Sequence, residues 1–590
     1  MRSVSNRHQA LMLLSLVTLG ILIYSNALEA PFCFDDGYNI VQNRHIRVTK
    51  LSFENLTRAA FKSPMPGRPI ANLSFALNFY FHGYDVIGYH VVNIMIHITT
   101  GILLYFFFKT TLSLSPLCSR YKPNSSIAFY TALIWLVHPI QSQSVTYVVQ
   151  RMNSLAAMFY ILSLLLYTKG RLVRKNEKSW PWFAGCSLAG IMAVGSKETA
   201  ATLPFFIILY EWYFFQDLSK AWLKRHLASF AGILILFGLL AFVYLGANPF
   251  DAILSTYEHR DFTLTERVLT QFRVVAYYMS LLLYPHPSRL VLLHDFELSQ
   301  SLVDPLTTLL SMGAIIGVIG LAFYTARKER LISFGILWFF GNLVIESSVI
   351  GLEIIYEHRT YLPSMFLFLI ITVVVHRCIK RELLKAGGLA AAMLLLSLWT
   401  YERNGVWNDS VTFWSDVVRK SPYNARAYNN LATCYMERRS HGLAITNLKQ
   451  AIHLNPNLIE ARINMGASLA AQNKLDQAIE HYCAALQVNP NFAAAHEFAG
   501  AHFNLGNALT RQGKLDKAIA HYSEALRIRP DDAEAHNNLG IALAAKGETS
   551  DALAHFREAL RIKPDFEDAN KNLLTFHKAG EPVNVNVSYK

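Results

Sequence analysis

The sequence predicts an all-α protein, in which a polytopic membrane domain of about eleven helices is followed by a solenoid of helical hairpins. Hydrophobic residues make up 53% of the 590-residue chain and charged residues only 16%, whereas soluble domains average about 25% charged residues. Apolar runs alternate with short basic loops up to about residue 400, and beyond it the chain becomes alanine-rich and repetitive. These observations place the membrane domain at residues 1–402, a linker at 403–422, the repeats with a capping helix at 423–578 and a tail at 579–590.

The membrane domain contains eleven apolar segments that are candidates for spanning helices. A spanning helix needs about 20 apolar residues, and somewhat fewer where polar groups line a cavity. The segments are residues 10–27, 89–108, 127–139, 154–168, 182–195, 200–215, 228–246, 304–324, 331–352, 360–375 and 386–402. The first segment lacks a small-residue cleavage site, so we expect it to be a retained signal anchor.

Basic loops between these segments predict the topology. If the N-terminus is inside, the clusters around residues 109–122, 169–178, 220–225, 327–330 and 377–385 all fall in cytoplasmic loops, as the positive-inside rule requires. The apolar segment 274–285 would break this pattern if it crossed, so we expect it to be an interfacial or re-entrant helix on the outer face. The odd number of spans then places the C-terminal domain outside, in the periplasm of a bacterial inner membrane or in the lumen of the endoplasmic reticulum.

The net charge of +13 is explained by these loops, so we expect no nucleic-acid partner. The six cysteines are scattered without CxxC spacing and indicate neither a zinc site nor a disulfide framework.

The C-terminal part contains an internal repeat marked by prolines. Pro422, Pro456 and Pro490 are 34 residues apart, as are Pro530 and Pro564. This is the period of tetratricopeptide repeats, in which each helical hairpin buries one face on the next. The interval between Pro490 and Pro530 is 40, so the third repeat is enlarged, and we expect residues 565–578 to form the capping helix.

Asparagines recur at one equivalent position on the first helix of each hairpin: Asn430, Asn464, Asn504 and Asn538. An asparagine side chain carries both a donor and an acceptor, so a ladder of them can pair with an extended peptide backbone. Because a buried asparagine must pair with some group, the same residues could instead join neighbouring hairpins. Both interpretations remain open at this stage.

Ionisable residues gather on the predicted outer face. Asp35 and Asp36 follow the first span directly, in FCFDDGYNI. Four candidates for holding an anionic phosphate end other apolar segments: Arg151, Lys197, His358 and Arg359. Supporting polar groups on the same face are Arg68, His90, His138, Gln141, Glu198, Arg273 and Glu357. Each residue alone has a structural explanation, such as snorkelling to the interface, but their convergence favours a phosphate site beside a general base.

Several motifs resemble a known family. The chain contains FDDGYNI, GRPIANLSFALN, HVVNIMIH, VHPIQSQSVTYVVQR, SKETAATLP and EHRTYLPS, followed by the repeats. In this order they resemble the transmembrane and tetratricopeptide-repeat-containing O-mannosyltransferases and their bacterial relatives. The resemblance implies a GT-C glycosyltransferase that uses a polyprenyl-phosphate sugar donor at the outer membrane face, and an inverting transfer to a protein acceptor bound in the repeat groove.

The residue types suit that reaction. An acceptor hydroxyl needs a carboxylate base within hydrogen-bond reach, which we expect to be Asp35 or Asp36. A cation must balance the charge that develops on the leaving phosphate. Carboxylates and phosphate together suit Mg²⁺ or Mn²⁺, although no further acidic ligand lies beside the pair, so no cofactor is firmly indicated.

Two other functions compete with this one. A membrane-anchored assembly scaffold would use the repeats alone, but a single span would suffice as its anchor. A polyprenyl-linked glycan ligase or polymerase would share the donor chemistry and use a sugar as its acceptor.

Overall fold

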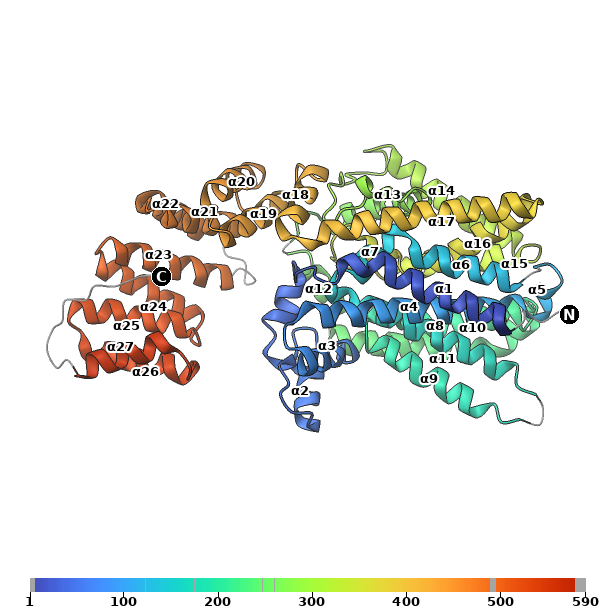
Figure 1. Ribbon diagram of the computed structural model, residues 1–590, viewed down its shortest axis with the longest axis horizontal. Coiled ribbons are helices and arrows are strands. Elements are labelled where there is room, and N and C mark those ends of the chain that lie inside the picture. The colour runs from blue at the N-terminus through green and yellow to red at the C-terminus, as the bar shows by residue number, and fades with distance from the viewer. Residues whose placement is uncertain are drawn as a thin grey trace. The chain divides into compact units, whose positions relative to one another are not determined.

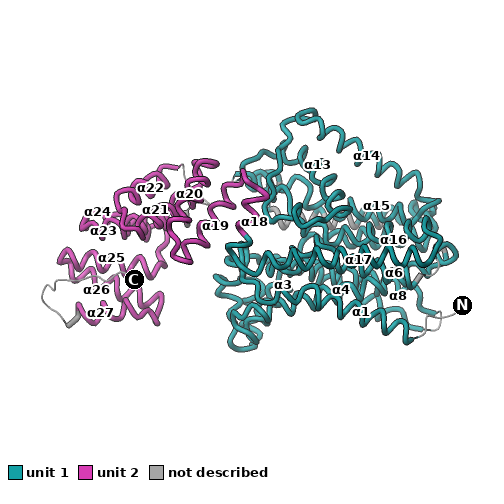
Figure 2. Tube along the Cα trace, turned by 45° about the horizontal axis from the view of Figure 1, so that its top comes forward, with its two compact units in different colours: residues 1–413 teal, residues 414–590 magenta. Residues whose placement is uncertain are grey.

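The computed structural model describes residues 6–121, 124–174, 177–246, 248–258, 260–488 and 495–578. Within these residues all regular secondary structure is helical. The chain divides into two compact units, Met1–Phe413 and Trp414–Lys590 (Figure 2). The all-α fold predicted from the sequence is confirmed.

The first unit is a bundle in which long helices run side by side along one axis (Figure 1). Its helices are α1 (Asn6–Tyr24), α2 (Phe53–Lys62), α3 (Pro69–His82), α4 (Val86–Leu112), α5 (Ser115–Cys118), α6 (Asn124–Val137), α7 (Ser142–Val145), α8 (Arg151–Arg171), α9 (Trp180–Val194), α10 (Leu203–Phe214), α11 (Lys220–Leu245), α12 (Pro249–Ser255), α13 (Leu264–Leu283), α14 (Thr307–Thr325), α15 (Arg330–Leu343), α16 (Ser364–Cys378) and α17 (Glu382–Gly405).

Each of the eleven predicted spans falls on one of these helices. Five helical segments among the described residues are long and apolar enough to cross a membrane: Asn6–Ala27, Val86–Leu112, Val148–Arg171, Thr307–Thr325 and Glu382–Asn408. Four shorter apolar helices accompany them: Ser125–Val137, Trp180–Val194, Arg330–Leu343 and Ser364–Cys378. Helix α13 covers most of the segment predicted to lie at the interface. The number of crossings and the orientation remain predictions.

Large apolar side chains are exposed along three of the long helices. They are Leu11 and Leu14 on α1, Ile316 and Leu321 on α14, and Leu394 and Leu398 on α17. A water-soluble protein rarely exposes so much contiguous apolar surface, whereas the hydrocarbon core of a bilayer accepts it. These faces therefore indicate contact with lipid.

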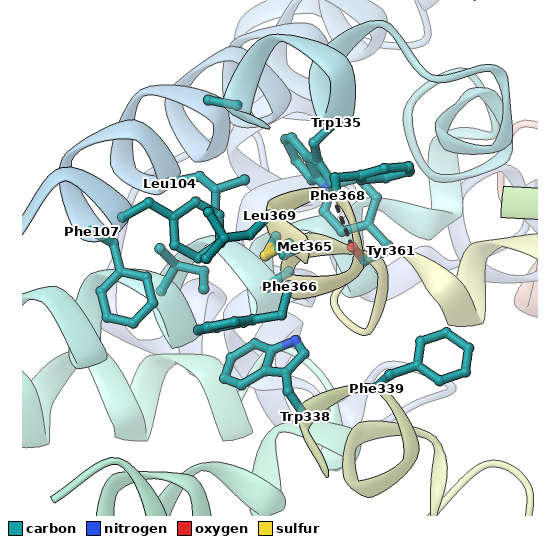
Figure 3. Close-up of a cluster of buried hydrophobic side chains, with 14 of the residues drawn as sticks. Leu104, Phe107, Trp135, Trp338, Phe339, Tyr361, Met365, Phe366, Phe368 and Leu369 are labelled. Carbon is teal, nitrogen blue, oxygen red and sulfur yellow. Dashed lines mark hydrogen bonds between the residues drawn. The ribbon is translucent and has the colours of Figure 1, made fainter. Parts of the chain in front are cut away.

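An aromatic core holds the bundle together next to the start of α16 (Figure 3). The indole N–H of Trp135 donates to the carbonyl of Tyr361 at 3.1 Å, and that of Trp338 donates to the carbonyl of Leu362 at 3.0 Å. Buried indoles need such partners. The two bonds fix the backbone that directly follows the EHRT turn, η8 (Glu357–Thr360), which carries three of the predicted site residues.

The second unit is a stack of helical hairpins. Its helices are α19 (Ala425–Glu437), α20 (His441–Leu454), α21 (Ile459–Ala471), α22 (Leu475–Gln487), α23 (Ala495–Arg511), α24 (Leu515–Ile528), α25 (Ala533–Lys546), α26 (Thr549–Ile562) and the capping helix α27 (Glu567–Lys578). A Cβ atom on Gly506 would lie 2.6 Å from the Tyr522 ring, and one on Gly540 would lie 2.7 Å from the Phe556 ring. Glycine is therefore required where the two helices of a hairpin meet at these rings.

The enlarged third repeat lengthens a helix: α23 has 17 residues, against 13 in α19 and 13 in α21. The segment predicted as a linker, residues 403–422, contains the end of α17, the short helix η9 (Val406–Asn408) and α18 (Ser410–Lys420). The predicted tail, residues 579–590, lies outside the described residues.

Candidate active site

The acidic pair lies in the loop that follows α1. The Asp36 carboxylate accepts hydrogen bonds from two backbone N–H groups, that of Cys33 at 3.0 Å and that of Val149 at 2.7 Å. Only 1% of Asp36 is exposed. Each carboxylate oxygen thus has a main-chain donor, so Asp36 clamps its own loop to the segment that leads into α8.

Burial raises the pKa of Asp36 to about 8, although the two N–H donors and Arg151 oppose the rise. A carboxyl group with a pKa near neutrality would suit a general base, but a base must first lie within hydrogen-bond reach of the proton that it takes. Both oxygens of Asp36 are already engaged and the side chain is inaccessible. An acceptor hydroxyl therefore cannot approach it without breaking the clamp.

Asp35 has a different environment, because it is only half-buried. Its backbone N–H donates to the hydroxyl of Tyr147 at 2.9 Å. The preceding residue, Phe34, has a φ of 48°, in the left-handed region that a bulky side chain rarely adopts. Such strain persists where the surroundings enforce it, and it concentrates at functional sites. The chain is thus strained immediately before Asp35.

Arg151 is fully buried and its guanidinium group is occupied. It donates to the Asn93 side chain at 2.7 Å and to the carbonyls of Ser74 and Tyr89 at 3.2 and 2.9 Å. Asn93 in turn donates to the carbonyl of Val145 at 3.0 Å. Arg151 therefore joins α3, α4 and α8.

His90 also supports the acidic loop. Its Nε2 atom lies 2.8 Å from the carbonyl oxygen of Ala30, and the side chain is buried. It thus fixes the chain five residues before Asp35.

A second group of polar side chains surrounds Lys197, which follows α9. The Lys197 ammonium lies 2.6 Å from the Glu346 carboxylate and 3.2 Å from the Asn153 side-chain oxygen. Both charged side chains are less than a tenth exposed. Asn153 also donates to the carbonyl of His358 at 2.8 Å, which ties the EHRT turn to α8.

His358 is held by Gln143. The Gln143 side-chain oxygen accepts the backbone N–H of His358 at 2.7 Å and lies 3.1 Å from its Nδ1 atom. Burial lowers the pKa of His358 well below its ordinary value, and the charges of Lys197, Arg359 and Arg68 lower it further. The imidazole is therefore neutral, and because Gln143 offers an acceptor, the proton belongs on Nδ1 and the lone pair on Nε2.

Two arginines complete this cationic cluster. Arg68 pairs with Glu198 through two contacts of 3.1 and 3.0 Å. Arg359 donates to the carbonyls of Ile354 and Glu353 at 3.2 and 2.7 Å. Burial is the main cause that lowers the pKa of Lys197, and the positive charges of Arg68 and Arg359 lower it further. The Glu346 carboxylate raises it again in part.

One short segment connects the acidic loop with the cationic cluster. Within residues 147–153, the Tyr147 hydroxyl meets Asp35, the Val149 N–H meets Asp36, and the Asn153 side chain meets Lys197. Arg151 lies between them and anchors the segment. The structure thus brings the two predicted halves of the site to one end of the bundle.

The remaining predicted residues make separate contacts. His138 reaches the carbonyl of Leu282 at 3.1 Å, and Gln141 reaches Ser364 at 3.4 Å. Arg273 donates to the carbonyl of Glu297 at 2.8 Å, and Glu357 accepts the N–H of Val291 at 2.5 Å. None of these four contacts joins them to the Lys197 cluster.

Glu346, Asn153 and Gln143 were missed by the sequence analysis. Glu346 had a usable signal, because it is an ionisable residue within a segment expected to span the membrane. Asn153 and Gln143 carried none, since uncharged amides are common near helix ends. Among the described residues, no group of three or more His, Cys, Asp or Glu side chains is arranged to hold a metal ion.

The asparagines of the repeats fall into two groups. Asn464 donates to Asn429 at 2.9 Å and Asn538 donates to Asn507 at 2.9 Å, each reaching the preceding hairpin. Asn572, one repeat further on, makes the same kind of bond with Asn537 at 2.9 Å. Asn430 and Asn504 are half-buried and have no side-chain hydrogen bond to any described residue.

Family comparisons identify the repeats directly. Tetratricopeptide repeat families match residues 425–458, 466–513, 506–547 and 533–566. A protein O-mannosyl-transferase of Caenorhabditis elegans is 25% identical over 465 residues, which cover 75% of this chain and 63% of the relative. The chain is a relative of the protein O-mannosyl-transferases.

Other relatives carry the same name. Human protein O-mannosyl-transferase TMTC3 is 23% identical over 517 residues, covering 81% of this chain and 55% of the relative. Mouse TMTC2 is 29% identical over 234 residues, covering 37% of this chain and 27% of the relative. The chain thus spans about 55–63% of the two relatives that it matches over most of its own length. The resemblance seen in the sequence motifs is confirmed.

Among solved structures, that of MamA is 25% identical, with a TM-score of 0.24, and the match covers 26% of this chain and 86% of MamA. The tetratricopeptide protein YrrB is 22% identical, with a TM-score of 0.24, and the match covers 34% of this chain and 95% of YrrB.

Proposed function

We propose that this protein transfers a sugar from a polyprenyl phosphate to hydroxyl groups of a protein acceptor, with inversion, at the membrane face that carries Asp35. The names of its relatives favour mannose as the sugar and protein as the acceptor. The observation that carries the proposal is the junction at residues 147–153, which contacts both the loop of the half-buried Asp35 and the cationic cluster around Lys197.

The cationic cluster suits the donor phosphate. Arg68, Lys197 and Arg359 face two carboxylates, those of Glu198 and Glu346, which leaves one positive charge in excess. A phosphate anion would balance that charge, and fixed cations stabilise the negative charge that develops on it during transfer. We assign Arg151 a positioning role, because its donors are occupied by the bundle.

His358 fits a role toward the sugar better than one toward the phosphate. A neutral imidazole with its lone pair on Nε2 accepts a hydrogen bond and repels an anionic oxygen. We therefore propose that Nε2 accepts a hydrogen bond from a hydroxyl group of the transferred sugar, and that Asn153 and Gln143 hold the ring and its turn in place.

Asp35 is the proposed base. Its carboxylate takes the proton of the acceptor hydroxyl while the hydroxyl oxygen forms a bond to C1 of the sugar. The bond between C1 and the phosphate oxygen breaks in the same step, and the polyprenyl phosphate leaves as an anion beside Lys197. No acid is needed, because a phosphate is a good leaving group without protonation.

The repeats are proposed to present the acceptor. Asn430 and Asn504 offer amide groups that the repeat stack does not use, and each amide can pair with one peptide unit of an extended chain. Asn464 and Asn538 already bridge neighbouring hairpins. We therefore propose that Asn430 and Asn504 bind the acceptor peptide and that Asn464 and Asn538 hold the hairpins together.

A transfer assay tests the proposal. Purified full-length protein is incubated with polyprenyl-phosphate mannose and a serine- and threonine-rich peptide, and mannosyl peptide is measured. We expect Arg68→Gln to weaken donor binding by about 1.5–3 kcal/mol, as for loss of a hydrogen bond to a charged group. Arg58→Gln is the matched control, because Arg58 pairs with Glu54 on the exposed surface of α2. Absence of mannosyl peptide with every polyprenyl donor and acceptor peptide would refute the proposal.

A further inference from the structure

A cavity of about 670 Å³ lies at the opposite end of the bundle from Asp35. Its walls come from α5 and the residues on either side of it, the ends of α8 and α10 with the residues that follow them, and the turn between α14 and α15. Helix α8 begins beside the acidic loop at Arg151 and ends at the cavity wall at Arg171. Its 21 residues correspond to roughly 30 Å, which is also the thickness of the hydrocarbon core of a bilayer. The cavity therefore lies at the other membrane surface.

Five cationic side chains line this cavity: Arg120, Arg171, Arg327, Lys328 and Arg330. Three of them are paired, Arg120 with Glu329, Arg171 with Glu211 and Arg330 with Asp217. Arg327 and Lys328 are exposed, and their side chains have no ion pair with any described residue. The cavity thus keeps two positive charges that no carboxylate of the described structure balances.

The cavity wall also contains strained backbone. Asp217 and the neighbouring Leu218 have φ values of 52° and 54°, so two consecutive non-glycine residues adopt the left-handed conformation. Strain of this kind concentrates at ligand sites. It places the Asp217 carboxylate, which is 81% exposed, in contact with Arg330 at the cavity.

Apolar side chains share the cavity with the cations. They are Leu114, Leu117, Leu172, Phe214 and Phe215. A soluble phosphate compound would make no contact with this apolar wall. An anionic lipid, in contrast, presents a phosphate to the cations and its glycerol and first methylene groups to the apolar residues. Basic pockets between helices at a membrane surface bind anionic headgroups in this way.

We propose that this cavity binds the phosphate headgroup of an anionic phospholipid from the leaflet opposite the candidate active site. Arg327 and Lys328 supply the charge that attracts it, and the paired arginines supply donors to its phosphate oxygens. The inference does not depend on the proposed transferase activity, because it rests on residues at the other end of the bundle.

Native mass spectrometry of the full-length protein in neutral detergent tests this proposal. Phosphatidylglycerol and zwitterionic phosphatidylcholine are titrated separately, and bound lipid is counted. We expect one preferentially retained phosphatidylglycerol, whose apparent affinity falls roughly tenfold or more in Arg327→Gln/Lys328→Gln. Asp217→Asn should strengthen binding, because it frees Arg330 from its carboxylate.

The matched control is Arg174→Gln/Lys178→Gln, which removes two exposed charges from the loop after α8 without touching the cavity. This variant should bind phosphatidylglycerol as the wild type does. Three results would overturn the proposal: equal binding of the two lipids, an equal loss in the control variant, or displacement of the lipid by inorganic phosphate at equimolar concentration.

Discussion

At the scale of single residues, the site depends on the distinction between charges that the fold buries and charges that are partly exposed. Asp36 and Arg151 are buried and hydrogen-bonded on all their polar atoms, and Lys197 is buried against Glu346, whereas Asp35 is only half-buried. We therefore propose different roles for the two adjacent carboxylates, because Asp36 is buried on two main-chain donors and Asp35 is more exposed.

The pair of Lys197 and Glu346 gives a prediction about stability. Lys197→Met leaves a buried carboxylate without its partner, so we expect a loss of about 3–5 kcal/mol in unfolding free energy. Glu346→Gln should lower the unfolding free energy by a similar amount, because it leaves the buried Lys197 ammonium without its partner. The double variant Lys197→Met/Glu346→Leu should recover stability while donor binding stays absent. Thermal unfolding and donor-lipid binding measure the two effects, and single variants as stable as the wild type would show that the pair is not buried.

The lowered pKa of Lys197 gives a prediction about pH. A lysine whose pKa is lowered loses its charge at a lower pH than an ordinary lysine does. As the pH is raised, affinity for the donor phosphate should therefore be lost before the pH reaches 10.5. In Lys197→Arg the charge persists above pH 12, and the fall should disappear. Donor affinity measured between pH 7 and 11 tests this, and identical profiles for the two proteins would contradict it.

At the scale of elements, periodic patterns were the predictable part. Apolar segments located all eleven helices expected to span, and the proline spacing located the hairpins, because both signals extend over many residues. The orientation of single side chains could not be predicted in the same way. Arg151 was expected to hold phosphate, yet the fold gives its donors three acceptors from α3 and α4, which are distant in sequence.

The asparagines of the repeats give a prediction at this scale. Asn430→Ala/Asn504→Ala should leave thermal unfolding unchanged, because these amides make no bond within the described repeats, and should reduce transfer to long acceptors. Asn464→Ala/Asn538→Ala should lower the unfolding temperature, at about 0.5–1.5 kcal/mol per lost bond. Transfer to long and to short acceptors is compared in both variants. A lower unfolding temperature in Asn430→Ala/Asn504→Ala would show that all four asparagines serve packing between hairpins.

At the scale of the whole molecule, the bundle has two polar ends separated by roughly the thickness of a bilayer core. One end carries the acidic loop and the cationic cluster, and the other carries the basic cavity. Exposed apolar faces of α1, α14 and α17 lie between them. This division fits a bundle that spans a bilayer.

We propose Asp35 as the base and Asp36 as the clamp, and comparison of Asp35→Asn with Asp36→Asn tests this assignment most directly. Sugar transfer and thermal unfolding are measured on both full-length variants. We predict that Asp35→Asn retains the wild-type unfolding temperature and donor affinity but loses transfer by a factor of about 10²–10⁴. Asp36→Asn should lower the unfolding temperature, because an amide nitrogen then faces a main-chain N–H. Wild-type transfer in Asp35→Asn, or loss of transfer in Asp36→Asn at unchanged stability, would contradict the assignment.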